Sequence, residues 1–417
     1  MTTQSGRPWR SQASSIQRPL PTPLTFDDLV ADLTWPKLLR AGPLAIRPSR
    51  VMLGMVWLVG AAGILWVCDR VDDAPNNVLA DGLRQIGLSY ASLFRGRSPE
   101  NYADLHDALL GAPARLVYEH PFVTILGLLA LVLWTSVLGG AISRSAASDF
   151  ALGRPISWPE ALGFSLSRWR SLAGSILLPL VLLWIITFSI TVGGLLLRVS
   201  GLNLLVGVGW GVFLVGGLVA AAIMTTFALG HTMLVPAITC EGTDAIDAVQ
   251  HAYAYVYAKP LRLVLYSLLL IVQGLIVVAI AWFVMLLTMH TAAWAAQGFA
   301  GARGEAIMAE VSRQIPAVPA LGRTGSSESL TNTDRYTAGM IAFWCYALFV
   351  ITLGVAVSVY WTSCTLLYLA MRRICDGQDV HELWAPGMIE GSLAPASTPP
   401  LPKPGETVSE TGPADET

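Results

Sequence analysis

Six long apolar stretches dominate the pattern of hydrophobic and polar positions along this chain. Each approaches or exceeds the roughly 20 apolar residues that a helix needs to cross a hydrocarbon core of about 30 Å. None alternates polar with apolar side chains as a barrel strand would, so the backbone hydrogen bonds must close within each stretch. The pattern predicts an all-α, polytopic transmembrane bundle with spans at residues 51–68, 121–142, 172–197, 204–227, 261–289 and 339–370.

Short amphipathic segments separate these spans on one side of the predicted membrane. "SWPEALGFSLSRWRS" opens with an S-x-x-E capping box, Ser157 and Glu160, and with Pro159 just inside the helix start. "GTDAIDAVQHAYAYVYAKP" opens with Asp244 and Asp247, which are acids where a helix N-terminus favours negative charge. The sequence therefore predicts capped interfacial helices, each joining an inward-going span to the next outward-going one.

The remaining segments complete the predicted organisation. "RVSGLN" is so short that it predicts an antiparallel hairpin of the third and fourth spans. Two larger external loops are expected, and short helices are predicted in both. The predicted segments outside the spans are a disordered tail at 1–24, a cytoplasmic amphipathic segment at 25–50, external loops at 69–120 and 290–338, a cytoplasmic helix end at 371–390, and a disordered tail at 391–417.

A stripe of small residues follows the fourth predicted span. Gly207, Gly211, Gly217 and Ala221 have the spacing that lets two helix backbones approach closely in lipid. We expect this stripe to pack inside one subunit, and a dimer face is the alternative.

The composition is that of a membrane protein, and it argues against several other classes of protein. Of 417 residues, 54% are hydrophobic and 13% charged, against about 25% charged in soluble domains. The net charge is −2 and the basic residues have no interleaved aromatic platform, so nucleic-acid binding is not expected. The five cysteines show no C-x-x-C spacing that would indicate a disulfide framework or a zinc site. The first 50 residues contain no cleavage signal, so the N-terminus is predicted to be retained.

Orientation follows from the basic residues near the span ends, because Lys and Arg are retained on the cytoplasmic side. One side carries Lys37, Arg40, Arg47, Arg50, Arg144, Arg154, Arg168, Arg170, Lys259, Arg262, Arg372 and Arg373. The other side carries Arg70, Arg115, Arg198, Arg303 and Arg335. The first set is more than twice the second, which predicts both termini in the cytoplasm.

The segment from Glu241 to Pro260 offers the richest candidate chemistry. At 100° per residue, Asp244, Asp247, His251 and Tyr255 share one face of a helix. Two carboxylates and an imidazole are ligands for a divalent ion, with Glu241 or His231 as a fourth group. Capping and an i,i+4 pair of Asp247 with His251 explain the same residues without a metal. We favour the structural interpretation, with no cofactor.

Three tyrosines and a lysine on the same segment predict a membrane interface. The rings of Tyr253, Tyr255 and Tyr257 prefer the headgroup zone, and Lys259 can meet lipid phosphates. Membrane lipid is therefore the expected partner of this helix, lying in the inner interface.

The span interiors hold no Asp, Glu, Lys or Arg in their central two-thirds, which disfavours an ion-coupled transporter. Gln273, Thr362 and Ser363 are the polar residues of interest there. Interhelical hydrogen bonding explains them, and a polar path for a substrate is the alternative. The sequence also lacks the G-x-S-x-G, H-E-x-x-H and P-loop motifs of soluble enzymes.

The run from 241 to 260, with "SVYWTSCTLLYLAMRRICDGQD" at the last span, resembles uncharacterised polytopic membrane proteins of planctomycete-like bacteria. The resemblance implies the architecture and carries no active site. We expect a non-enzymatic, multi-pass protein of the bacterial inner membrane whose interfacial helices organise lipid or contact partner proteins, other copies included. The alternatives are an uncoupled transporter or channel for a neutral or amphiphilic solute, and a metal-dependent membrane enzyme.

Overall fold

The computed structural model describes residues 35–71, 78–92, 107–315, 330–385 and 388, and the described ranges contain helices and no β-strand. The long helices are α4 (Pro48–Val71), α8 (Pro121–Leu152), α10 (Trp169–Leu195), α12 (Trp210–Glu241), α14 (Pro260–Gln314) and α15 (Asn332–Asp376). All six are long and apolar enough to span a membrane. The protein is therefore an all-α, multi-pass membrane protein, as the sequence predicts.

Shorter elements connect or precede the spans. They are α2 (Trp35–Leu38), α3 (Ala41–Ala45), α5 (Val78–Ser92), the π-helix Asp107–Gly111, α7 (Ala112–Glu119), α9 (Trp158–Ser167), the 3₁₀ turn Leu196–Arg198, α11 (Leu202–Val208) and α13 (Ala245–Ala258). The predicted disordered tails and the first part of the 25–50 segment lie outside the described residues. Residues 72–77 and 93–106 of the first loop and 316–329 of the second also lie outside them.

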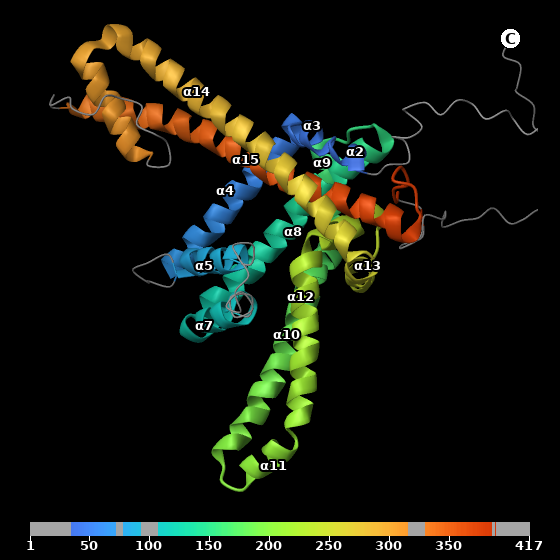
Figure 1. Cartoon of the computed structure of the whole chain (residues 1–417). Coiled ribbons are helices and arrows are strands. Elements are labelled where there is room, and N and C mark those ends of the chain that lie inside the picture. The colour runs from blue at the N-terminus through green and yellow to red at the C-terminus, as the bar shows by residue number, and fades with distance from the viewer. Residues whose placement is uncertain (1–34, 72–77, 93–106, 316–329, 386–387, 389–417) are drawn as a thin grey trace, which may run out of the picture.

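The six spans form three antiparallel hairpins that diverge from one end of the molecule (Figure 1). We call them arm 1 (α4 and α8), arm 2 (α10 and α12) and arm 3 (α14 and α15). At their common end, the termini of the spans pack with α2, α3, α9 and α13, and we call this region the hub. The far ends carry α5 and α7 on arm 1, α11 on arm 2, and the last part of α14 on arm 3 (Figure 1).

A short helix in the hub precedes each arm, as the sequence predicts for the segments before these spans. Asp244 caps α13, accepting hydrogen bonds of 2.9 Å from the backbone N–H groups of Ile246 and Asp247. Ser157 is the N-cap of α9, but its side chain makes no capping hydrogen bond. The predicted capping box is therefore wrong in its bonding, although the helix begins where it predicts.

The spans that run toward the hub, α8, α12 and α15, all end in the same way. Gly153, Gly242 and Gly377 follow them with φ of 64°, 65° and 71°, a left-handed conformation that is nearly strain-free only for glycine. The chain can therefore leave each span sharply and turn into the hub.

Two predicted boundaries move. The fourth span was expected at 204–227, but α11 takes up Leu204 to Val208 and α12 continues to Glu241. The apolar run in the sequence ends near His231 and Pro236. The helix continues past both residues, because neighbouring helices cover the half of α12 that lies toward the hub. The sixth span extends at both ends, from a capping box of Thr331 and Asp334 to Asp376.

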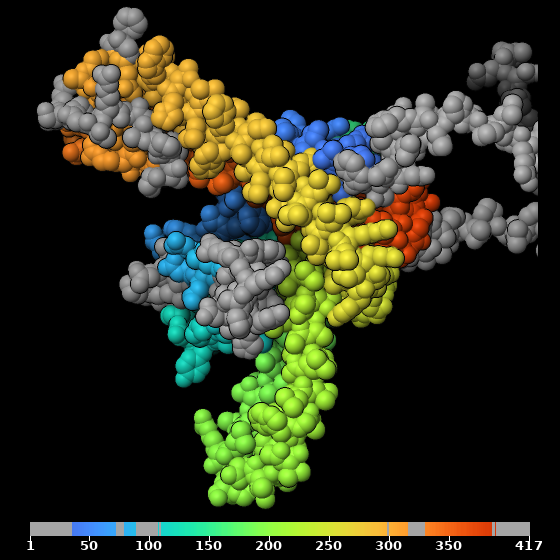
Figure 2. Space-filling model, viewed as in Figure 1, coloured from blue at the N-terminus to red at the C-terminus, as the bar shows by residue number. Residues whose placement is uncertain are grey.

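The arms are tied together mainly at the hub. In the most apolar window of each span, the buried share is between 6% and 28%, and the lowest value belongs to α10 of arm 2. Arm 2 stands out from the rest of the molecule in Figure 2. Arms 1 and 3 also cross closely where Gly54 meets Gly354, because a Cβ on Gly54 would lie 2.4 Å from the Gly354 carbonyl oxygen.

The small-residue stripe does not pack inside the subunit, so that expectation is wrong. A Cβ atom added at Gly207, Gly211 or Gly217 would meet nothing within 4 Å, and Ala221 is exposed. The α10–α12 hairpin itself forms as predicted, with contacts made by other residues.

Candidate functional site

The three spans that run toward the hub meet through a triad of hydroxyl groups. Ser143 of α8 lies 2.8 Å from the Thr239 hydroxyl of α12 and 2.8 Å from the Thr365 hydroxyl of α15. All three side chains are fully buried. Each arm therefore contributes one hydroxyl, and the network closes without a charge because hydroxyls donate and accept.

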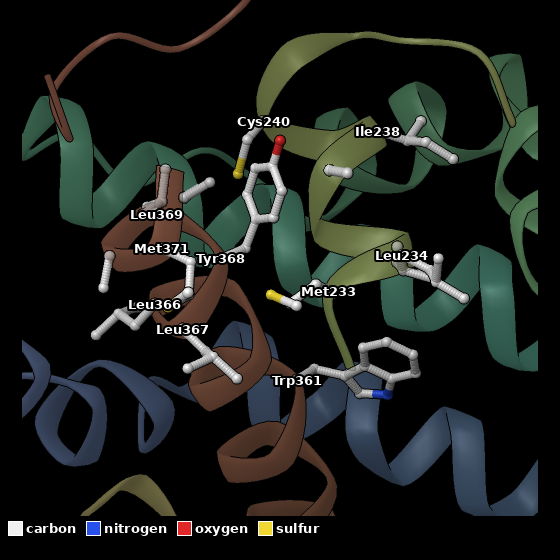
Figure 3. Packing of buried hydrophobic residues seen from close by; sticks show 14 of the residues in the cluster. Met233, Leu234, Ile238, Cys240, Trp361, Leu366, Leu367, Tyr368, Leu369 and Met371 are labelled. Atoms are coloured by element: carbon white, nitrogen blue, oxygen red, sulfur yellow. The ribbon is translucent and has the colours of Figure 1, made fainter. Parts of the chain in front are cut away.

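Glu241, the last residue of α12, is the centre of an acid–base network in the hub. Tyr368 donates a hydrogen bond of 2.5 Å to one of its carboxylate oxygens, and His251 Nδ1 lies 3.0 Å from the other. Arg372 forms an ion pair with Glu241 at 3.7 Å, a distance too long for a hydrogen bond. One buried carboxylate thus joins α12 to α13 and α15. Figure 3 shows the Tyr368 hydroxyl directed toward the Cys240 end of α12.

A second contact fastens α13 to the end of α15. The Tyr255 hydroxyl donates to Asp376, and its ring lies 5.9 Å from the Tyr368 ring and 6.3 Å from His251. Burial is the largest cause that raises the pKa of Tyr255, and the hydrogen bond to the Asp376 carboxylate raises it further. The hydrogen bond with Glu241 raises the pKa of His251 above its usual 6.5, although its partial burial works the other way.

Two arginines bind backbone carbonyls and hold the segment after α15 against the hub. Arg372 is fully buried and donates to the carbonyl oxygens of Asp379 and Glu382 at 3.0 and 2.5 Å. Arg144 donates to the carbonyl oxygens of Thr239 and Trp384, both at 2.8 Å. These bonds satisfy backbone acceptors that burial would otherwise leave unpaired.

The Trp384 indole completes this contact. Arg168 lies over its ring at 4.8 Å and donates to the carbonyl oxygen of Gly242 at 2.7 Å. A Cβ on Gly242 would lie 2.4 Å from the same ring. Only glycine therefore fits at this position, for its backbone conformation and for the space.

A buried ion pair connects the start of α4 to the end of α8. Arg50 is fully buried, and its Nη2 lies 2.6 Å from a carboxylate oxygen of Asp149, which is 3% exposed. Arg50 also donates to the Ser145 carbonyl oxygen at 3.0 Å and hydroxyl at 3.1 Å, and to the Leu44 carbonyl oxygen. Arg47 pairs with the same carboxylate at 2.9 Å.

The metal candidates do not come together as ligands. Asp244 is engaged in capping, and the His251 ring nitrogen bonds Glu241 rather than forming the predicted pair with Asp247. Within the described residues, no three His, Cys, Asp or Glu side chains gather into a group that could hold a metal.

The interfacial candidates differ in their exposure. Tyr257 and Lys259 are exposed, and the Tyr257 hydroxyl lies 2.6 Å from that of Thr226 on α12. Tyr255 is 1% exposed and belongs to the hub core, so the prediction that it faces the headgroups is wrong. Tyr253 is half-buried; burial raises its pKa to about 12, and its hydroxyl has no hydrogen-bond partner.

The residues of the predicted polar path have different surroundings. Gln273 donates a hydrogen bond of 2.5 Å to the Leu39 carbonyl oxygen, which fastens α14 to the hub. Thr362 is fully buried, and its hydroxyl has no partner. Ser363 faces a pocket of about 400 Å³ between α12, α14 and α15. Only Ser363 of the three borders this space.

Sequence reasoning missed the most connected residues of the hub. The sequence pattern alone gives no signal for Tyr368 or Asp149. It marks Arg50 and Arg372 only as indicators of topology, and Glu241 only as a fourth metal ligand. The available signal was position, because each lies within about two turns of the hub end of its span, where a buried charge needs a partner from another helix. The hydrogen bonds and ion pairs of these residues connect helices of the hub to one another.

Comparisons with known proteins add nothing to this geometry: no family model, no curated protein and no solved structure matches the chain. The resemblance to polytopic membrane proteins of planctomycete-like bacteria therefore stays a prediction.

Proposed function

We propose that this membrane protein is a non-enzymatic scaffold that organises lipid, with its hub at the cytoplasmic face of the inner membrane. The observation that carries the proposal is the contrast between a hub joined by buried ion pairs and arms whose spans bury at most 28% of their most apolar windows. In a membrane, the uncovered apolar surface between diverging arms is solvated by lipid chains.

The rim of the hub suits the headgroups of anionic lipids. Trp169 and Tyr257 are 44% and 65% exposed there, and Arg170 lies over the Trp169 ring at 5.6 Å. Lys259 and Arg262 are exposed nearby, where α14 begins. Exposed rings beside basic residues are typical of a membrane interface, and each Lys or Arg near an anionic surface contributes about 1 kcal/mol.

The test removes three charges at the rim and three at the far ends. Arg170→Gln, Lys259→Gln and Arg262→Gln together should weaken binding of anionic phospholipid by about 3 kcal/mol, or roughly 100-fold. Mass spectrometry of the purified protein would measure the anionic and zwitterionic phospholipid retained per chain.

The matched control carries Arg70→Gln, Arg198→Gln and Arg335→Gln, which are exposed residues at the far ends of the arms. We expect it to retain anionic lipid like the wild type. Equal retention by the two triple variants would contradict the proposed role of the rim.

Partner proteins and self-association stay predictions. An uncoupled transporter for an amphiphilic solute is the second candidate, favoured by the pocket that Ser363 borders. Flux into reconstituted vesicles that disappears in Ser363→Phe and persists in Ala221→Phe would support the transporter. A metal-dependent enzyme has no comparable observation, because Asp244 and His251 are engaged in bonds within the hub.

A further inference from the structure

A short segment that follows α15 contacts the other two arms. Residues 378–385, which we call the strap, form neither helix nor strand. The Nδ1 atom of His381 donates a hydrogen bond of 2.8 Å to the carbonyl oxygen of Ala151, near the end of α8. The backbone N–H of Trp384 donates one of 2.8 Å to the carbonyl oxygen of Cys240, near the end of α12. The strap therefore ties arm 3, from which it continues, to arms 1 and 2.

The surface under the strap binds its backbone and one aromatic ring. Arg372 of α15 and Arg144 of α8 donate to carbonyl oxygens of the strap rather than to its carboxylates. The Trp384 side chain is buried against Gly242, with the Arg168 guanidinium over its ring. The strap is therefore held by neutral acceptors and by apolar burial.

These contacts let the strap leave while the rest of the hub stays bonded. The ion pair that it makes, between Asp379 and Arg373 at 3.6 Å, lies within arm 3. Gly377 precedes the strap with φ of 71°, and a Cβ there would meet nothing within 4 Å, so the chain can swing at this point. Ordering the strap costs conformational entropy, which opposes what its neutral hydrogen bonds contribute. The hydroxyl triad and the Glu241 bonds do not involve the strap.

The strap holds the arms at a different level from the hydroxyl triad. On α8, Ala151 lies eight residues past Ser143, and on α15, Arg372 lies seven residues past Thr365. These separations are about 10–12 Å along each helix, toward the hub end. A helix held at two separated levels has a fixed direction, whereas a helix held at one level can pivot. The strap therefore restricts the angles between the arms.

We propose that the strap is a releasable clasp. When it is docked, it fixes the angles between the arms, and when it is released, the arms pivot about the hydroxyl triad. The clasp goes beyond the proposed lipid scaffold, and its test does not depend on the rim of the hub.

The test measures the angle between arms 2 and 3 in the full chain in nanodiscs. Pulsed EPR gives the distance between spin labels attached through non-canonical amino acids at Ala221 of α12 and Ile351 of α15, which are both exposed. The wild type should give one narrow distribution. Trp384→Ala removes the buried ring and should at least roughly double its width, because the released arms sample more angles. The matched control, Trp158→Ala, removes an exposed tryptophan of α9 and should leave the width unchanged.

A peptide of residues 377–385 separates release of the strap from misfolding of the variant. At saturating concentration it supplies the indole and the carbonyl oxygens that Arg144 and Arg372 bind, so the narrow distribution should return in Trp384→Ala. The same peptide with alanine in place of tryptophan should have no effect. Equal widths in the wild type and Trp384→Ala would overturn the proposal. A broad distribution that the wild-type peptide does not narrow would also overturn it, by showing a disturbed hub rather than a reversible clasp.

Discussion

Removing Asp149 should expose how much the hub depends on its buried ion pair. In Asp149→Leu, Arg50 loses its only carboxylate partner among the described residues. It keeps bonds to two carbonyl oxygens and the Ser145 hydroxyl, none of which carries a charge. Because Arg50 is fully buried, its guanidinium cannot turn to water. A buried charge left without its partner costs about 3–5 kcal/mol.

Two further variants separate this cost from a general loss of packing. Arg47 also pairs with Asp149, but its side chain is 41% exposed, so Arg47→Ala should cost no more than about 1 kcal/mol. The double variant Arg50→Met with Asp149→Leu removes both buried charges. It should be more stable than Asp149→Leu alone by about 1–3 kcal/mol, because the uncompensated charge is gone.

Equilibrium unfolding in mixed micelles, followed by tryptophan fluorescence, gives the three differences in unfolding free energy. If Asp149→Leu lost less than about 1 kcal/mol, the pair would behave as an exposed one, and the reasoning about its burial would be refuted. The same conclusion would follow if adding Arg50→Met to Asp149→Leu lowered the unfolding free energy as much as Arg50→Met does by itself.

Three other changes test separate parts of the hub. The hydrogen bond with Glu241 raises the pKa of His251. The contribution of this bond to the unfolding free energy is therefore present below pH of about 6.5 and is lost as pH rises through the raised pKa. Unfolding measured from pH 5 to 9 should show this dependence, and His251→Gln should flatten it. Gly242→Ala should lower the melting temperature more than Gly377→Ala, because both glycines have positive φ but only a Cβ at Gly242 meets the Trp384 indole. Equal decreases in melting temperature would show that the contact with Trp384 does not matter. Tyr253→Phe should raise the unfolding free energy by about 1 kcal/mol, because it removes a buried hydroxyl without a partner, and a loss in chemical unfolding would show that this hydroxyl is bonded.

The apolar runs predict the spans well because lipid imposes a single requirement, a helix without exposed backbone groups. They do not predict how the spans are grouped. The position of arm 2 relative to the others depends on contacts such as that between Ser143 and Thr239, which are 96 residues apart. A serine or threonine in a span is also satisfied by a carbonyl of its own helix, as for Thr288 and Val284, so sequence does not separate the two cases.

The interfacial helix shows why its residues were only half predicted. A helical wheel assumes one wet face and one dry face, and it placed Tyr255 with the polar residues. In the structure α13 is covered by α12 on one side and by the end of α15 on another, so Tyr255 and Val256, which adjoin in sequence, are both buried. The sequence offers Glu241 only as a fourth metal ligand, because the partner that explains it, Tyr368, is 127 residues away.

The position of the charges explains how the arms can diverge and still form one molecule. A charge in the middle of a span must be neutralised by a partner helix at the same depth, which would pull two arms together in the hydrocarbon core. Here Arg50, Asp149, Glu241 and Arg372 all lie near the hub ends of their spans, where they can bind one another and nearby backbone carbonyls. Apart from the close crossing of α4 and α15, the outer halves of the arms are left to contact lipid. The angles between the arms are consequently set at the hub, where Glu241 joins α12 to α13 and α15.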